Sequence, residues 1–154
     1  DLIPGAIVDP RAFEPCGYSM NAILFRTYYT IHITPETGSS YASFETNQQV
    51  TSYRSLISNV VRTFRPKRFV MTLMADDGGL REMQENPFSG SSMDARIVVP
   101  STKENVSYKR NSLASIKVEE DCSCMMGNWE LTEDNMETPA KNIRADKPRG
   151  FSVV

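Results

Sequence analysis

Four side chains in the first part of the chain could take part in chemistry. His32, the only histidine among the 154 residues, could act as a general base, because an imidazole changes charge near neutral pH. Ser19 could be a nucleophile if a base lay nearby, Glu36 could bind sugar hydroxyls, and Phe13 could stack on a purine ring. Each also has an ordinary interpretation: a structural histidine, a turn serine, a solvated carboxylate and a core aromatic. Taken singly, the ordinary interpretations are favoured.

The elements around these residues are predicted to be strands. Apolar and polar residues alternate strictly over residues 29–34, which is the period of a half-buried strand, and this places His32 on the polar face. Residues 17–34 as a whole are interpreted as two β segments. A turn at 37–39 and a second alternating run over 41–46 predict an antiparallel hairpin.

A helix is predicted after the hairpin. Apolar residues at i, i+3, i+4 and i+7 spacing form one stripe over residues 53–64, which is interpreted as a face packed on a sheet. Thr51 or Ser52 is expected to cap the helix, and Pro66 to end it. Residues 69–74 return to strand character, which completes a β-β-α-β unit of the α+β class. Alone, this unit would have an uncovered sheet face or edge, so we expect it to be part of a larger fold.

The second half of the chain carries a weaker pattern. Residues 76–79 predict a turn, and residues 82–103 a long surface loop that contains a short strand at 97–99. We expect one domain over residues 1–131 and a polar, flexible tail over residues 132–154. Candidate core residues in the last part of the domain are Leu113, Ile116, Val118, Met125, Met126, Trp129 and Leu131.

Composition argues against several classes of protein. A net charge of −2 and a pI near 5.5 give no sign of nucleic-acid binding. No run of about 18 apolar residues predicts a membrane span, and no signal-peptide pattern opens the chain. Three cysteines, with Cys122 and Cys124 too close to bridge comfortably, suit a reducing compartment, so a cytoplasmic location is expected. No metal site is expected, because a zinc site at this pair would need two more ligands.

Three segments taken together resemble the eukaryotic S-adenosylmethionine decarboxylases. They read F-E-P-C-G-Y-S-M-N over residues 13–21, Y-Y-T-I-H-I-T-P-E over 28–36 and S-Y-A-S-F-E-T-N over 40–47. The opening D-L-I-P-G is similar to the family's lead-in to the first segment. The resemblance continues to about Leu73, so it covers roughly the first half of the chain.

This resemblance implies a carboxy-lyase that makes the aminopropyl donor for spermidine and spermine synthesis from S-adenosylmethionine. Family members are proenzymes that cut themselves at a Glu-Ser bond, and the serine becomes a pyruvoyl group whose Schiff base with the substrate accepts electrons as CO₂ leaves. The implied fold is a four-layer αββα sandwich with antiparallel sheets, of which this chain supplies part of the second half. Implied partners are the N-terminal segments of the same protein, putrescine as an activator in some members, and a second copy in a homodimer of processed chain pairs.

The resemblance also implies roles for five residues. Ser19 and His32 match residues that assist self-processing: His32 would take a proton from the ester intermediate, and Ser19 would hold that intermediate by a hydrogen bond. Phe13 matches an aromatic that stacks on adenine, and Glu36 a carboxylate that binds the ribose hydroxyls. Glu45 matches one of several acids through which putrescine acts.

The chain also departs from the family pattern. It contains no Glu-Ser pair, and the serine-rich stretch at 88–93 lies after the matching segments instead of before them. The family's catalytic cysteine is expected upstream of this chain, and Cys16 is not that residue. We therefore expect residues 1–154 to be inactive alone. An alternative is a catalytically dead regulatory paralogue that activates a live enzyme, although retention of both Ser19 and His32 favours the enzyme.

Overall fold

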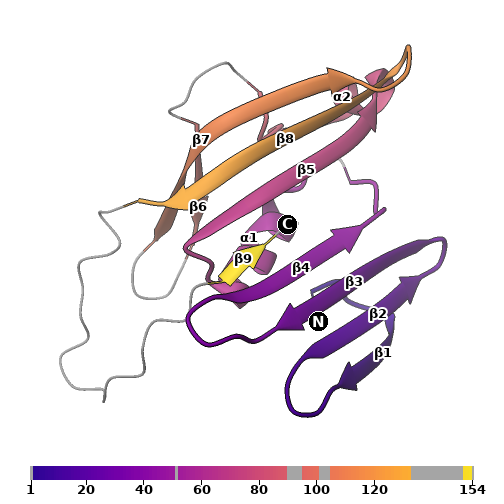
Figure 1. Ribbon diagram of the computed structural model, residues 1–154. Helices are drawn as coiled ribbons and strands as arrows, with labels where there is room; N and C mark the ends of the chain where they lie inside the picture. Colours follow the sequence, from indigo (N-terminus) through magenta and orange to yellow (C-terminus); the bar gives the residue numbers. More distant parts are fainter. Residues whose placement is uncertain (1, 51, 90–94, 101–104, 133–150, 154) are drawn as a thin grey trace.

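The computed structural model describes residues 2–50, 52–89, 95–100, 105–132 and 151–153. Within these residues, nine strands form one hydrogen-bonded sheet in the order β1-β2-β3-β4-β9-β5-β8-β7-β6. The longer helix, α1, lies against one face of the sheet, behind the region where β4 and β5 approach each other (Figure 1). Helix and antiparallel strands together confirm the predicted α+β class.

The first four strands form an antiparallel meander. They are β1 (Ile7–Ala12), β2 (Tyr18–Leu24), β3 (Thr27–Thr34) and β4 (Ser40–Thr46). The two β segments and the hairpin predicted from the alternating pattern are therefore confirmed. Tyr29 and Ile31 are buried on the α1 face, while His32 is exposed on the other.

Helix α1 (Arg54–Phe64) and strand β5 (Arg68–Asp76) follow the meander. The apolar stripe packs on the sheet as expected, with Val60, Val61 and Phe64 buried. The N-cap is Tyr53, one residue later than predicted, but Ser52 Oγ accepts a 3.4 Å hydrogen bond from the Arg54 N–H at the start of the helix. Thr51 lies outside the described residues, and the Ser52 hydroxyl donates a 3.3 Å hydrogen bond to Glu85 Oε2. The helix ends before Pro66, as predicted.

The last large group of strands is also antiparallel. It consists of β6 (Arg96–Val99), β7 (Val106–Lys117) and β8 (Cys122–Leu131), with β8 paired to β5. The short strand predicted at 97–99 is confirmed. The turn predicted at 76–79 was wrong, because these residues begin a short helix, α2 (Asp77–Glu82). The Asp76 carboxylate accepts a hydrogen bond of 2.6 Å from the Gly79 N–H and so caps this helix.

Several candidate core residues of this hairpin are on the surface. Leu113, Ile116, Val118 and Met126 are 37%, 62%, 50% and 43% exposed. The β7–β8 hairpin extends past α1 toward α2 (Figure 1). Trp129 alone of the candidates is fully buried; its ring stacks on Phe69 with centroids 6.0 Å apart.

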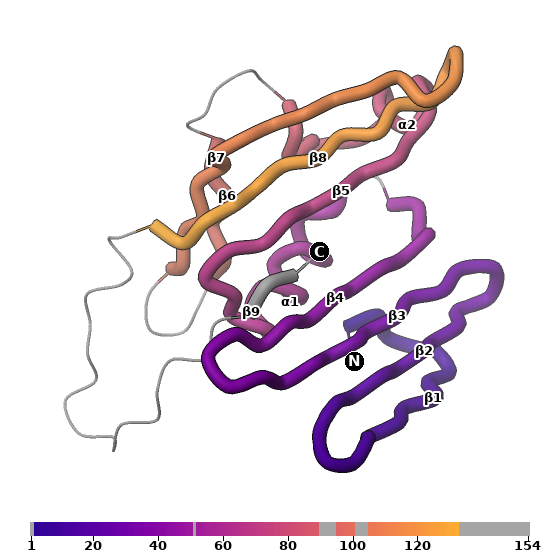
Figure 2. Tube along the Cα trace, in the orientation of Figure 1, coloured from indigo at the N-terminus to yellow at the C-terminus, as the bar shows by residue number. Residues whose placement is uncertain are grey.

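Strand β9 (Phe151–Val153) joins the two antiparallel groups. It pairs in parallel with β4 on one side and with β5 on the other, so β4 and β5 run in the same direction. The flexible tail expected over 132–154 lies mostly outside the described residues, since 133–150 and 154 are not described. Figure 1 shows β9 as a short arrow beside the starts of β4 and β5, whose traces Figure 2 gives in the same orientation.

Candidate functional site

Ser19 and His32 form the centre of the candidate site. They lie directly opposite each other in the β2–β3 ladder, and Ser19 Oγ is 3.0 Å from His32 Nδ1. In an antiparallel pair, opposite residues project to the same face, so both side chains stand on the face away from α1. Within the described residues His32 Nε2 has no partner, so the ring has one nitrogen held by the serine and one available.

The tight β2–β3 turn sets this register. Leu24 pairs with Thr27 at the end of the ladder, and the Thr27 hydroxyl donates a 2.8 Å hydrogen bond to the Leu24 carbonyl. Phe25 takes a left-handed conformation with φ 55° and is 94% exposed. A shift of one residue at this turn would move His32 to the α1 face. The turn therefore brings Ser19 and His32 together.

A third polar residue flanks His32 from β4. Ser43 is its cross-strand partner in the β3–β4 ladder and is only 6% exposed. Sequence reasoning did not select Ser43 as a site residue. The signal for it was present, because the alternation in 41–46 puts Ser43 on the same face as Glu45.

Phe13 and Glu36 lie at the same end of the β2–β3 hairpin as the Ser19–His32 pair. Phe13 is 53% exposed, and its N–H donates to the Gly17 carbonyl at 3.0 Å. Glu36 follows β3 and is exposed, and its N–H donates to Ser40 Oγ at 3.4 Å. The Cys16 thiol, which contacts the Pro35 carbonyl at 3.7 Å, joins the two loops. The fold therefore gathers Phe13, Glu36, Ser19 and His32 at one end of one hairpin.

Glu45 lies further along the sheet. It pairs with Thr30, two positions before His32 on β3, and its side chain is exposed. Glu45 also lines a cavity of about 650 Å³ between β4, β5 and α1. It is thus separate from the other four predicted residues, although it stands on the same face as Ser43.

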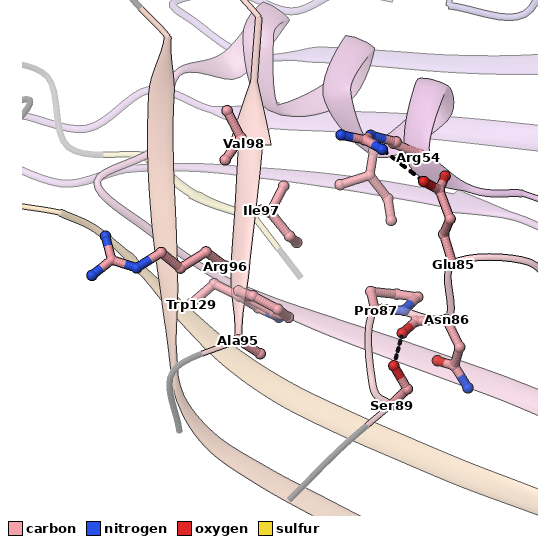
Figure 3. Close-up of a pocket in the computed structure, with 11 residues that line it drawn as sticks. Arg54, Glu85, Asn86, Pro87, Ser89, Ala95, Arg96, Ile97, Val98 and Trp129 are labelled. Atoms are coloured by element: carbon pink, nitrogen blue, oxygen red, sulfur yellow. Dashed lines mark hydrogen bonds and ion pairs between the residues drawn. The ribbon is translucent and has the colours of Figure 1, made fainter. Parts of the chain in front are cut away.

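A second hollow lies on the α1 side of the sheet. It has a volume of about 350 Å³ and is bordered by α1, β6, the segment around Pro87 and the buried Trp129 (Figure 3). Arg54 and Glu85 form an ion pair of 2.6 Å at its rim. None of the five predicted site residues lines this hollow.

No cluster of three or more His, Cys, Asp or Glu side chains is placed to hold a metal ion in the part of the chain that the structure describes. No described helix is long and apolar enough to cross a lipid bilayer.

Comparison with known proteins connects this site with a family. A family model described as adenosylmethionine decarboxylase matches residues 1–129. The chain belongs to this family. The adenosylmethionine decarboxylase match includes all five predicted site residues and extends well past Leu73, where the visible resemblance ends.

Curated relatives of the family are similar over the N-terminal half. The chain is 50% identical over 78 residues to the S-adenosylmethionine decarboxylase proenzyme of Dictyostelium discoideum and 54% identical over 77 residues to that of Xenopus laevis. These matches cover 51% and 49% of this chain, but only 21% and 23% of the relatives. The chain therefore spans about a fifth of the length of the curated relatives it matches.

A solved structure supports the predicted fold. The crystal structure of the Trypanosoma brucei AdoMetDC-delta26 monomer matches 82% of this chain with a TM-score of 0.64 and 27% sequence identity. The same match covers 47% of that monomer. This likeness confirms that the chain has part of the adenosylmethionine decarboxylase fold.

Proposed function

We propose that the complete protein decarboxylates S-adenosylmethionine to the aminopropyl donor used for spermidine and spermine synthesis, and that this chain assists the self-cleavage that matures the enzyme. The observation that carries the proposal is the 3.0 Å Ser19–His32 contact in a chain that belongs to the adenosylmethionine decarboxylase family.

In this proposal His32 moves a proton during self-cleavage. Its Nδ1 is held by the Ser19 hydroxyl, so Nε2 is the nitrogen that would accept a proton from the ester intermediate. An exposed imidazole on an open sheet face is reachable by a segment from outside this chain. Ser19 would keep the ring in place and offer its hydroxyl to the intermediate.

A pyruvoyl group would supply the electron sink for decarboxylation in the mature enzyme. No Glu-Ser pair occurs in these residues, so the serine that forms it would come from outside them. The residues present fit such a group, because the Ser19–His32 pair stands on a polar face of the sheet and His32 is exposed there, where an incoming segment can contact it. Alone, residues 1–154 should therefore be inactive.

Phe13 and Glu36 would bind the nucleoside of the substrate. A half-exposed aromatic ring can stack on adenine and lies favourably beside a sulfonium cation. An exposed carboxylate can accept hydrogen bonds from both ribose hydroxyls. Their position at the end of the hairpin that carries His32 supports a substrate site next to the processing site.

Three further features are part of the proposal. Glu45 would be one acid of a putrescine site in members that respond to this diamine. The mature enzyme would be a homodimer of processed chain pairs, and it would act in the cytoplasm. The free thiols of Cys16, Cys122 and Cys124 are compatible with a reducing compartment.

The test is release of labelled CO₂ from carboxyl-labelled S-adenosylmethionine. We expect the protein expressed from its complete open reading frame to release label and residues 1–154 alone to release none. Turnover by residues 1–154 would refute the assignment of the electron sink to a segment outside them. No turnover by a complete protein that has cleaved itself would refute the activity.

A further inference from the structure

A row of polar side chains crosses the first four strands at the candidate site. Arg11 on β1 is the direct partner of Ser19 on β2. Ser19 and His32 are partners in turn, and Ser43 on β4 is the next partner of His32. Direct partners in antiparallel strands project to the same face of a sheet. Arg11 therefore places a cation on the face that carries Ser19 and His32, one strand away from the serine.

The neighbouring row on this face holds the aromatic ring of the candidate site. Phe13 lies two residues after Arg11, and its N–H donates to the Gly17 carbonyl, which continues the β1–β2 ladder. A Cβ at Gly17 would lie 3.7 Å from Phe13 Cβ and 3.8 Å from Phe13 Cδ2, so the phenyl ring lies against this glycine. Alternate residues of an extended chain are about 6.8 Å apart. A nucleoside stacked on Phe13 would therefore bring the rest of a small substrate close to Arg11.

The Arg11 guanidinium is available to a ligand. Arg11 is exposed and lies on β1, the outermost strand at one edge of the sheet (Figure 1). Acids occur on β1 and on the loops at this end of the hairpin, namely Asp9, Glu14 and Glu36. Within the part of the chain that the structure describes, none of them pairs with Arg11, and its side chain forms no hydrogen bond. Its five N–H donors can therefore bind an anion in a planar, forked geometry.

Both steps of the proposed function involve a negatively charged oxygen. In self-cleavage the serine oxygen bonds to the preceding carbonyl carbon, and the carbonyl electron pair moves onto its oxygen. When that pair returns, the C–N bond breaks and the nitrogen takes the proton of the serine hydroxyl. In decarboxylation the substrate enters with its carboxylate. A cation beside Ser19 and His32 would stabilise either charge by charge-assisted hydrogen bonds.

We propose that Arg11 binds an oxyanion at the candidate site. The oxyanion is either the carbonyl oxygen that becomes charged during self-cleavage or the carboxylate of the substrate. This role rests on the proposed function and adds to it a residue that neither the sequence pattern nor the resemblance selected. It follows from the β1–β2 register, which makes Arg11 the partner of Ser19.

Self-cleavage of the complete protein tests the first source of the oxyanion. Arg11→Gln removes the charge and should slow cleavage at least about tenfold, whereas Arg11→Lys keeps the charge and should restore much of the rate. Arg26→Gln is the matched control, because Arg26 is exposed at the β2–β3 turn, at the other end of the hairpin. In about 1 M salt the rates of Arg11→Gln and the unchanged protein should converge, because ions screen an exposed charge.

Steady-state kinetics of the processed enzyme test the second source. Arg11→Gln should raise the KM for S-adenosylmethionine at least about tenfold without lowering kcat, because a contact with the carboxylate is lost as CO₂ leaves. The decarboxylated product is the matched ligand, since it has no carboxylate. Its inhibition constant should be the same for Arg11→Gln and the unchanged enzyme. An equal rise in both constants would exclude a contact with the carboxylate.

The outcomes separate this role from the proposed function. Slower cleavage alone assigns the oxyanion to the cleavage step, and a higher KM alone assigns it to the substrate. Normal cleavage and a normal KM for Arg11→Gln, in a protein that cleaves and decarboxylates, would overturn the role of Arg11 and leave the proposed function intact. A defect that Arg11→Gln and Arg11→Lys share equally, and that salt does not change, would mark a structural role and also overturn it. A complete protein that neither cleaves nor decarboxylates would overturn both.

Discussion

Ser19 on β2 and His32 on β3 are direct cross-strand partners, with Ser19 Oγ 3.0 Å from His32 Nδ1. Thirteen positions separate them in sequence, and only the antiparallel ladder brings them into contact. The contact fixes one ring nitrogen and leaves the other available. It is the arrangement expected of a positioned proton acceptor.

Removal of the imidazole should block maturation. In the complete protein, His32→Ala should slow self-cleavage at least ~100-fold, because a positioned general base contributes that much or more. Ser19→Ala should slow it by about fivefold to tenfold if only the hydrogen bond to the ring is lost. Thr30→Ala, on the same face of β3, is the matched control and should cleave at the normal rate. Gel electrophoresis of samples taken over time measures all three. Cleavage of His32→Ala at the normal rate would contradict the role.

Two exposed phenylalanines allow a matched test of substrate binding. Phe13→Ala should raise the KM of the processed enzyme by about tenfold, because a stacked ring contributes roughly 0.5–1.5 kcal/mol beyond its burial. Phe25→Ala is the control, since Phe25 is 94% exposed and lies at the opposite end of the β2–β3 hairpin. Initial rates at varied S-adenosylmethionine concentration give both values. Equal KM values for the two variants would exclude Phe13 from the substrate site.

The core around Trp129 should not tolerate a side chain at Gly127. A Cβ there would lie 3.1 Å from Trp129 Nε1 and 3.4 Å from Phe88 Cε1, and both rings are buried. Gly127→Ala should lower the free energy of unfolding by roughly 1–2 kcal/mol through overpacking. Ser123→Ala on the same strand should change it by less than about 0.5 kcal/mol. Urea unfolding followed by Trp129 fluorescence measures both, and equal midpoints would show that the core relaxes without cost.

The free energy of unfolding should fall at high pH because the buried Tyr108 hydroxyl ionises. Burial raises the pKa of Tyr108 to about 12, and its hydroxyl donates to the Pro66 carbonyl at 2.8 Å. The unfolded tyrosine ionises near pH 10, so the stabilisation is complete below pH 10 and is lost as the pH rises toward 12. Tyr108→Phe should be less stable at pH 8 by about 1 kcal/mol.

The same variant should lose less stability between pH 8 and pH 11 than the unchanged protein. It should still lose some, because burial also raises the pKa of Tyr29. Urea midpoints at the two pH values give the comparison. If both proteins lose the same free energy of unfolding between pH 8 and pH 11, the loss at high pH comes from groups other than Tyr108.

Much of the N-terminal fold could be predicted from residue pattern. Strict alternation over 29–34 and the looser alternation over 41–46 predicted the hairpin and the polar face of His32, and the 3.6-residue stripe predicted α1. The prediction that Ile116 and Val118 are core residues was wrong. An apolar residue type does not show whether another element covers the side chain. The sequence Asp76-Asp77-Gly78-Gly79 predicts a turn but caps and begins α2, because a helix cap and a turn use the same residue types.

The site was predictable in part. Ser19, His32, Phe13 and Glu36 came from the family resemblance, and no periodicity could have paired Ser19 with His32 without the turn at Leu24–Thr27. Ser43 was missed, although the alternation over 41–46 places it on the same face as Glu45.

Intact mass spectrometry of the protein expressed from its complete open reading frame shows whether it is a self-processing decarboxylase. We expect two chains, of which the one containing residues 1–154 begins with a pyruvoyl group whose mass shifts on borohydride reduction. A single uncut chain would contradict it, and would instead support a regulatory paralogue that acts through an active partner.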